Sequence, residues 1–190
     1  MLTLVGQNLQ TFKNKDVGTG ANVLHLDLTC NCFTSGKELS VFPNLRTLVL
    51  DDNQLEDLSD FPVLKHLETF SANKNNLCNL DQFLDDAFDR FGKLKNLSLL
   101  KNPLNPYFED EHKYSIYRDK VLDRFPNLKT LDGCAVEIIM KDVAAKRKAE
   151  EEKYETIKAN IVVDEKYKDT QVKSVKTKSE GNRYLKNHQL

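Results

Sequence analysis

The sequence predicts an α/β solenoid in which short parallel strands form one face and helices and turns form the other. Two observations predict it: a hydrophobic pattern that recurs along the chain, and an asparagine at the same place in each copy. The pattern has apolar residues at positions 1, 4, 6 and 11 and asparagine at position 9, and four copies place that residue at Asn31, Asn53, Asn75 and Asn102. Such self-similarity at a fixed interval is the sequence signature of repeat architectures.

The physical chemistry of this template identifies leucine-rich repeats. Positions 4 and 6 flank one outward residue, which is typical of a short strand because successive side chains point to opposite faces. Asparagine carries one acceptor and two donors, so it can satisfy backbone groups in a buried turn. One copy cannot bury its apolar side alone, so the copies stack into a continuous core. Leu2, Leu4, Gln7 and Leu9 fit a truncated entry copy.

The longest interval between two repeat asparagines contains a predicted convex helix. Its apolar residues recur at helical spacing; they are Leu80, Phe83, Leu84, Ala87, Phe88 and Phe91. Asp81, Asp85 and Asp89 lie on another face of this helix. We interpret them as a solvated acidic face rather than as a metal site.

Residues 107–135 predict a C-terminal cap. Tyr114, Tyr117, Val121 and Leu122 fall at helical spacing, and Pro126 should end the helix near the preceding residue. A terminal repeat needs such special residues because one of its faces has no neighbour. Residues 114–133 resemble the cap of small leucine-rich-repeat domains such as the A-prime subunit of the spliceosomal branch-site particle, and that resemblance implies a fold but no partner.

The chain divides into a leucine-rich-repeat domain at 1–135, a charged helix at 136–160 and a flexible tail at 161–190. A formal net charge of −1 conceals −5 before residue 141 and +4 from there onwards. The middle of the tail is polar and without periodicity, as in disordered segments. Tyr184, Leu185 and Leu190 restore apolar anchors at the end of the chain, which suits capture in a groove, although a structureless end fits this composition equally well.

Positions 3, 5 and 7 of each copy should point out of the concave face and form a partner-binding surface. These residues are His25, Asp27, Thr29, Thr47, Val49, Asp51, Thr69, Ser71, Asn73, Asn96, Ser98 and Leu100, and position 8 adds Cys30, Asp52, Lys74 and Lys101. The surface is nearly neutral and lacks the basic stripe and stacking aromatics that nucleic acid requires. We therefore expect a folded protein as the partner, with Val49 and Leu100 as hot spots; an inert solvated sheet is the alternative.

No pattern of residues supports an enzyme, a cofactor or a metal site. Cys30 and Cys32 have no second Cys or His pair at zinc spacing. His25 and Asp27 have no nucleophile or orienting group in view, and residues 18–20 lack the Gly-Lys-Ser/Thr of a phosphate loop. With no membrane-spanning run, no signal peptide and cysteines read as free thiols, we expect a cytoplasmic monomer that reaches membranes only through its partners.

Three segments resemble the leucine-rich melanocyte differentiation-associated family: residues 48–55, residues 109–132, and the end of the chain. That resemblance implies an adaptor in endosomal recycling and melanosome biogenesis, whose repeat domain binds a Rab GTPase. It further implies that the tail binds retriever, part of the Commander recycling complex, and that the chain is recruited to endosomes or lysosome-related organelles. The tail residues so implied are Gly181, Asn182, Arg183, Tyr184, Leu185, Gln189 and Leu190. There are two alternatives: a ribonucleoprotein scaffold like the A-prime subunit, and a ciliary repeat protein.

Overall fold

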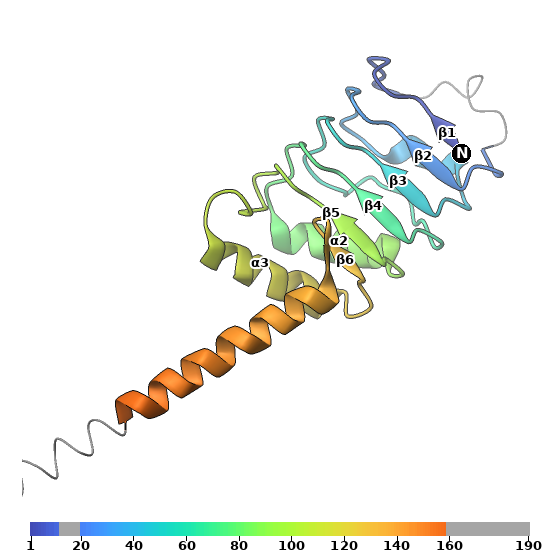
Figure 1. Cartoon of the computed structure of the whole chain (residues 1–190). Coiled ribbons are helices and arrows are strands. Elements are labelled where there is room, and N and C mark those ends of the chain that lie inside the picture. The colour runs from blue at the N-terminus through green and yellow to red at the C-terminus, as the bar shows by residue number, and fades with distance from the viewer. Residues whose placement is uncertain (12–19, 159–190) are drawn as a thin grey trace, which may run out of the picture. The chain divides into compact units, whose positions relative to one another are not determined.

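A computed structural model describes residues 1–11 and 20–158 and has the predicted solenoid. Over these residues one sheet runs in sequence order from β1 to β7 (Figure 1). The first six strands pair in parallel and β7 turns back antiparallel. The strands are β1 (Leu2–Thr3), β2 (His25–Asp27), β3 (Thr47–Val49), β4 (Thr69–Ser71), β5 (Asn96–Ser98), β6 (Thr130–Leu131) and β7 (Cys134–Ala135).

The register of the strands confirms the phase of the repeat. The residue at position 4 of each copy pairs with its equivalent in the next strand. These residues are buried and form one continuous row of the core; they are Leu26, Leu48, Phe70, Leu97 and Leu131. The entry copy also forms, because Leu2 of β1 pairs with Leu26.

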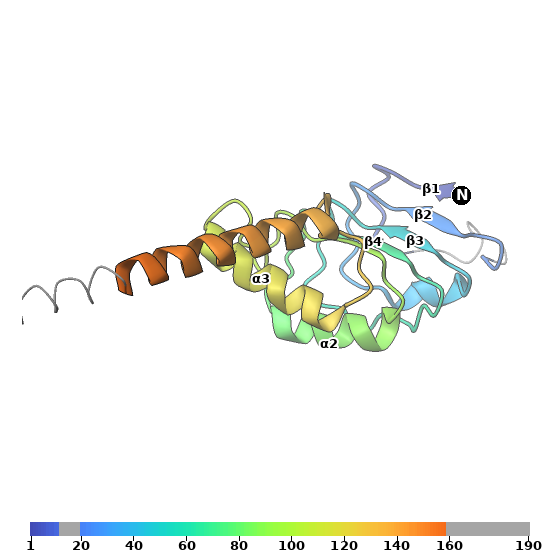
Figure 2. The ribbon, with the colours of Figure 1, turned by 60° about the horizontal axis from the view of Figure 1, so that its bottom comes forward.

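Helices lie on one side of the sheet, as Figures 1 and 2 show. They are η1 (Lys37–Val41), α2 (Leu80–Phe91) and α3 (Glu111–Arg124). Helix α2 begins after Asn79, whose side chain accepts a hydrogen bond from the Gln82 amide, the usual N-cap arrangement. Helix α3 begins after Asp110 in the same way. It ends at Arg124, so the predicted stop before Pro126 is confirmed.

The buried asparagines connect neighbouring repeats, as the template predicts. The Asn53 Nδ2 donates to the carbonyls of Leu28 and Leu50 at 3.0 and 3.1 Å. Its Oδ1 accepts from the Phe33 amide at 3.0 Å. Asn31 serves the entry copy by accepting from the amides of Gln7 and Leu9. Each asparagine therefore satisfies backbone groups in its own repeat and in the preceding one.

Position 8 of every copy adopts a left-handed backbone that the sequence did not predict. None of these residues is glycine, the residue that enters this region at no steric penalty. Their φ angles lie between +52° and +59°; the residues are Cys30, Asp52, Lys74 and Lys101. The recurring conformation turns the chain out of the strand so that the next residue, asparagine, points inward.

Helices α2 and α3 are joined by ion pairs that the sequence did not predict. Lys120 pairs with Asp81, and Arg124 pairs with Asp85, each at 2.8 Å. The guanidinium of Arg124 also lies 4.3 Å from the ring centre of Phe88. Two of the three aspartates of the acidic face of α2 therefore contact the cap, yet all three remain exposed to solvent, as the sequence predicts.

The described residues divide into two units, the first of residues 1–139 and the second beginning at Met140. A helix over residues 136–158 begins in the first unit, where Ile139 is buried in the core. Among the described residues, no helix is both long enough and apolar enough to cross a membrane.

Candidate protein-binding face

The sheet brings the predicted concave residues together on the face that points away from α2 and α3, here called the concave face. At position 3, the His25 Nδ1 lies 3.0 Å from the Thr47 Oγ1. Farther along the same row, the Asn96 Nδ2 donates to the Thr69 Oγ1, and the Thr130 hydroxyl donates to the Asn96 Oδ1. This row therefore continues into the cap strand β6, one strand beyond the predicted surface.

The centre of the concave face is a hydrogen-bonded cluster around Asp51 and Asn73. Asp51 accepts from the Ser71 hydroxyl at 2.7 Å and from the Asn73 amide at 2.9 Å. The Asn73 Oδ1 accepts from the Ser98 hydroxyl at 2.8 Å and from the Leu100 amide at 2.7 Å. These side chains are held in place before any partner arrives, which lowers the entropy lost on binding.

The concave side chains at positions 3, 5 and 7 are less exposed than the sequence analysis predicts. Only His25 is exposed, and the other concave residues at positions 3, 5 and 7 are half-buried. The physical reason is that these side chains form hydrogen bonds with one another. Asp27, for example, accepts from both the amide and the hydroxyl of Thr29. Small polar side chains that bond to one another shield each other from water.

Val49 and Leu100 remain the apolar positions of the concave face. Val49 pairs in register with Asp27 on one side and Ser71 on the other. Leu100 follows the last repeat strand and is half-buried. Because the polar neighbours already have hydrogen-bond partners, burying these two side chains is the main favourable term that a partner could gain here.

Tyr107 and Phe108 form an exposed aromatic pair that the sequence analysis did not identify as a site. Phe108 is 64% exposed, and its ring lies 4.8 Å from that of Tyr107. The ammonium of Lys101, at position 8 of the last repeat, lies 5.9 Å from the Phe108 ring centre. Two adjacent aromatic residues after Pro106, in the loop before a capped helix, were the available signal. Exposed aromatic residues are enriched at hot spots.

The position 8 row is a short chain of polar contacts beside the concave face. The Cys30 thiol donates to the Asp52 Oδ2 at 3.4 Å, and Lys74 pairs with the same oxygen at 3.6 Å. This hydrogen bond to Asp52 raises the pKa of the Cys30 thiol. The thiol is therefore held in its neutral form, which is the less nucleophilic one. Among residues 1–11 and 20–158, no three His, Cys, Asp or Glu side chains are grouped to hold a metal ion.

A buried carboxylate closes the C-terminal end of the solenoid. In the earlier repeats the position 6 amide donates to a strand carbonyl of the next repeat, as Leu50 does to Ser71. Leu99 has no such carbonyl and donates to the Asp132 Oδ1 at 2.8 Å. Asn105 and Tyr114 donate to the other oxygen. Burial raises the pKa of Asp132 despite these donors.

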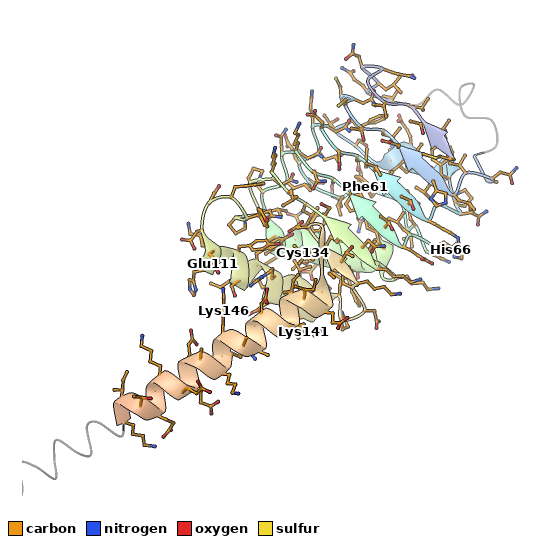
Figure 3. All side chains as sticks on the ribbon, in the orientation of Figure 1. Phe61, His66, Glu111, Cys134, Lys141 and Lys146 are labelled. Carbon is orange, nitrogen blue, oxygen red and sulfur yellow. The ribbon has the colours of Figure 1, made fainter. Side chains whose placement is uncertain are left out.

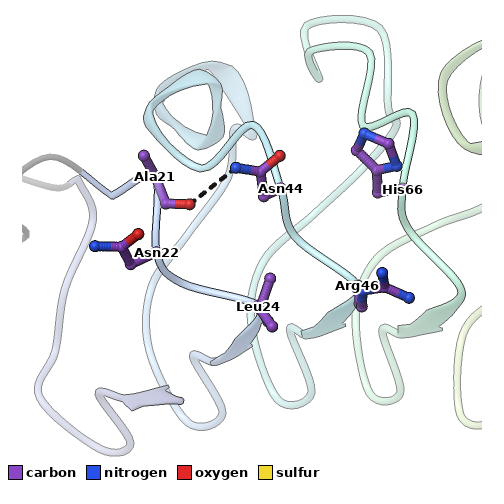
Figure 4. Close-up of a pocket in the computed structure, with 6 residues that line it drawn as sticks. All are labelled: Ala21, Asn22, Leu24, Asn44, Arg46 and His66. Carbon is purple, nitrogen blue, oxygen red and sulfur yellow. Dashed lines mark hydrogen bonds between the residues drawn. The ribbon is translucent and has the colours of Figure 1, made fainter.

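A shallow hollow of 360 Å³ lies on the N-terminal side of β2 and β3 (Figure 4). The Asn44 side chain donates to the Ala21 carbonyl at 3.0 Å on one wall. Arg46 pairs with Glu68, so its charge is already partly neutralised. The hollow is lined by Ala21, Asn22, Leu24, Asn44, Arg46 and His66. None of the predicted concave residues lines this hollow.

The chain is a leucine-rich-repeat protein. No family model matches it. It is 41% identical over 100 residues to the human leucine-rich melanocyte differentiation-associated protein, which covers 50% of each chain. It is 32% identical over 135 residues to the U2 small nuclear ribonucleoprotein A' of Candida albicans, covering 69% of this chain and 54% of that protein. The chain thus spans about half the length of these curated relatives.

A solved structure supports the fold independently. The Drosophila melanogaster SNF/U2A' complex contains a chain that superposes with a TM-score of 0.58 over 76% of this chain and 78% of its own length. At 24% identity, this likeness concerns the fold alone. The tail residues implied by the family resemblance, from Gly181 to Leu190, lie outside the described residues.

Proposed function

We propose that this chain is a non-enzymatic adaptor that binds a folded protein on its concave face. The observation that carries the proposal is the concave face itself: a pre-organised polar cluster with Val49 and Leu100 as apolar positions. Solenoids characteristically present such extended surfaces to partners. Tyr107, Phe108 and Lys101 extend this surface beside the last repeat, where an aromatic pair can anchor a partner.

The partner that the resemblance favours is a Rab GTPase of melanosomes and related organelles, with retriever as the second partner through the tail. The 41% identity with the human leucine-rich melanocyte differentiation-associated protein over half of this chain supports this assignment. Residues 179–185 and the final Gln189-Leu190 support it for the tail. The adaptor would then act at endosomes or lysosome-related organelles.

The experiment is a binding measurement with purified chain, GTP-loaded organelle Rabs and retriever. Val49→Lys and Leu100→Lys should each weaken Rab binding by about tenfold or more, as expected for hot-spot positions. Val63→Lys is the matched control, because Val63 is 58% exposed in a loop that contributes no concave residue. Deleting residues 179–190 should abolish retriever binding and leave Rab binding unchanged. Failure of the intact chain to bind either partner would refute the trafficking assignment.

The second candidate is a scaffold subunit of a ribonucleoprotein, with the concave face holding an RNA-binding protein. The 32% identity with the Candida albicans U2 A' protein over 69% of this chain favours it. Fluorescent tagging of the full chain separates the two, since endosomal puncta and nuclear staining are distinct. A ciliary repeat protein, the third alternative, predicts staining of the cilium.

A further inference from the structure

The helix at 140–158 carries an apolar stripe along one side. Met140, Val143, Tyr154 and Ile157 all fall within an arc of about 100° when each residue advances the helix by about 100°. Met140, Tyr154 and Ile157 are 57%, 65% and 49% exposed, and Val143 is half-buried. Figure 3 shows the side chains that this helix presents. A row of large apolar side chains in water is characteristic of an interaction surface.

The middle of the same stripe holds one basic and one acidic residue. Arg147 and Glu150 lie between Val143 and Tyr154 with spacings of four, three and four. The whole stripe therefore follows the alternating three and four spacing of a coiled-coil seam. A charged pair at the centre of a seam weakens packing but specifies register and orientation.

We propose that this stripe pairs with the same stripe of a second copy of the chain, in antiparallel orientation. Antiparallel pairing about the point midway between Arg147 and Glu150 sets each arginine against the glutamate of the second copy. The same register sets Val143 against Tyr154 and Met140 against Ile157. The sequence of side chains is thus self-complementary, as a two-fold symmetric interface requires.

Parallel pairing of the two helices would instead bring like charges together. It places Arg147 against Arg147 and Glu150 against Glu150, and like charges in contact across an interface are strongly unfavourable. The remaining faces of the helix carry both signs, with an ion pair between Lys148 and Glu152. A helix that lies on a membrane has instead a polar face rich in lysine and arginine. Charge therefore favours a second copy over a lipid surface.

This inference goes beyond the proposed adaptor and departs from the monomer expected from the sequence. A dimer would carry two concave faces, so a partner presented in several copies on a membrane would be bound with higher avidity.

The test is the mass of the full chain in solution, measured by light scattering and sedimentation over a concentration series. The wild type should approach twice the 21.8 kDa of one chain. Arg147→Glu and Glu150→Arg should each shift the chain to the monomer, weakening self-association by about tenfold or more because like charges then meet. Lys148→Glu, an equal charge change off the stripe, should leave the dimer intact.

The decisive arm mixes the two single variants in equal amounts. Each pair of facing positions then holds one acidic and one basic side chain, so the mixture should recover the dimer mass, as should the Arg147→Glu/Glu150→Arg double variant. Circular dichroism establishes that every variant retains its helix content. A wild type that stays monomeric throughout the series overturns the proposal. So does a mixture that stays monomeric, or single variants that remain dimeric.

Discussion

Replacing Asn75 by alanine tests the mechanism that holds adjacent repeats together. The Asn75 Nδ2 donates to the carbonyls of Leu50, Ala72 and Asn73 at 2.9 to 3.1 Å, and its Oδ1 accepts from the Leu55 amide at 3.0 Å. Each of the three carbonyls keeps another donor in the variant. The buried Leu55 amide loses the acceptor that satisfies it.

The magnitude follows from that difference. An unsatisfied buried amide destabilises by about 1–3 kcal/mol, and each lost hydrogen bond whose acceptor keeps a partner costs about 0.5–1 kcal/mol. The total loss is therefore about 2.5–6 kcal/mol, which for a chain of this size lowers the melting temperature by about 5–24 °C. Urea unfolding followed by circular dichroism gives the free energy directly.

The adjacent Asn76 supplies a matched control. It is the same residue type in the same turn, but its side chain is exposed. Asn76→Ala should change the free energy of unfolding by less than about 0.5 kcal/mol. If the two alanine variants unfold at the same urea concentration, the asparagine ladder does not hold the repeats together and the reasoning is refuted.

Three further perturbations test the core, the cap and one close contact. Leu99→Ala should lower the free energy of unfolding by about 2–5 kcal/mol, whereas Thr47→Ala should change it by less than about 0.5 kcal/mol; equal values in urea would contradict the assigned phase. Burial raises the pKa of Asp132 above its ordinary 3.8, so its contribution is fully present below that pH and is lost as pH rises through the folded-state pKa. The free energy of unfolding of the wild type minus that of Asp132→Asn should therefore fall as the pH rises above 3.8, and a flat difference in a urea series would contradict this. Gly36→Ala would place a methyl group in steric overlap with the ring of the buried Phe61, and should destabilise the fold by about 1–3 kcal/mol; an unchanged melting temperature would contradict it.

The sequence predicted the repeat stack well because its determinants are local. The spacing of Leu48 and Leu50 predicts a strand, and the hydrogen-bonding capacity of Asn53 predicts the turn. Both signals recur in each copy, so the parallel register follows once the copies are aligned. The N-cap of α3 and its end before Pro126 are local for the same reason.

The sequence did not predict contacts that depend on how distant segments meet. The pairing of Asp81 with Lys120 spans 39 residues, and nothing in the acidic pattern of α2 indicates which cation approaches it. The half-burial of Asp51 depends on Ser71 and Asn73 from the next repeat. The left-handed backbone at Lys74 is hidden by its side chain, because lysine carries no local preference for a positive φ.

Backbone amides at the two ends of the solenoid find their hydrogen-bond acceptors in different ways. At the N-terminal end the entry strand is present, and Asn31 of the following repeat satisfies the amides of Gln7 and Leu9. At the C-terminal end the position 6 amide of Leu99 faces no equivalent carbonyl, so the Asp132 carboxylate accepts its hydrogen bond. A backbone carbonyl is neutral at every pH, whereas a buried carboxylate carries a desolvation penalty when ionised. The hydrogen bond that closes the C-terminal end therefore depends on pH, whereas the equivalent bonds between strand backbones in the earlier repeats do not.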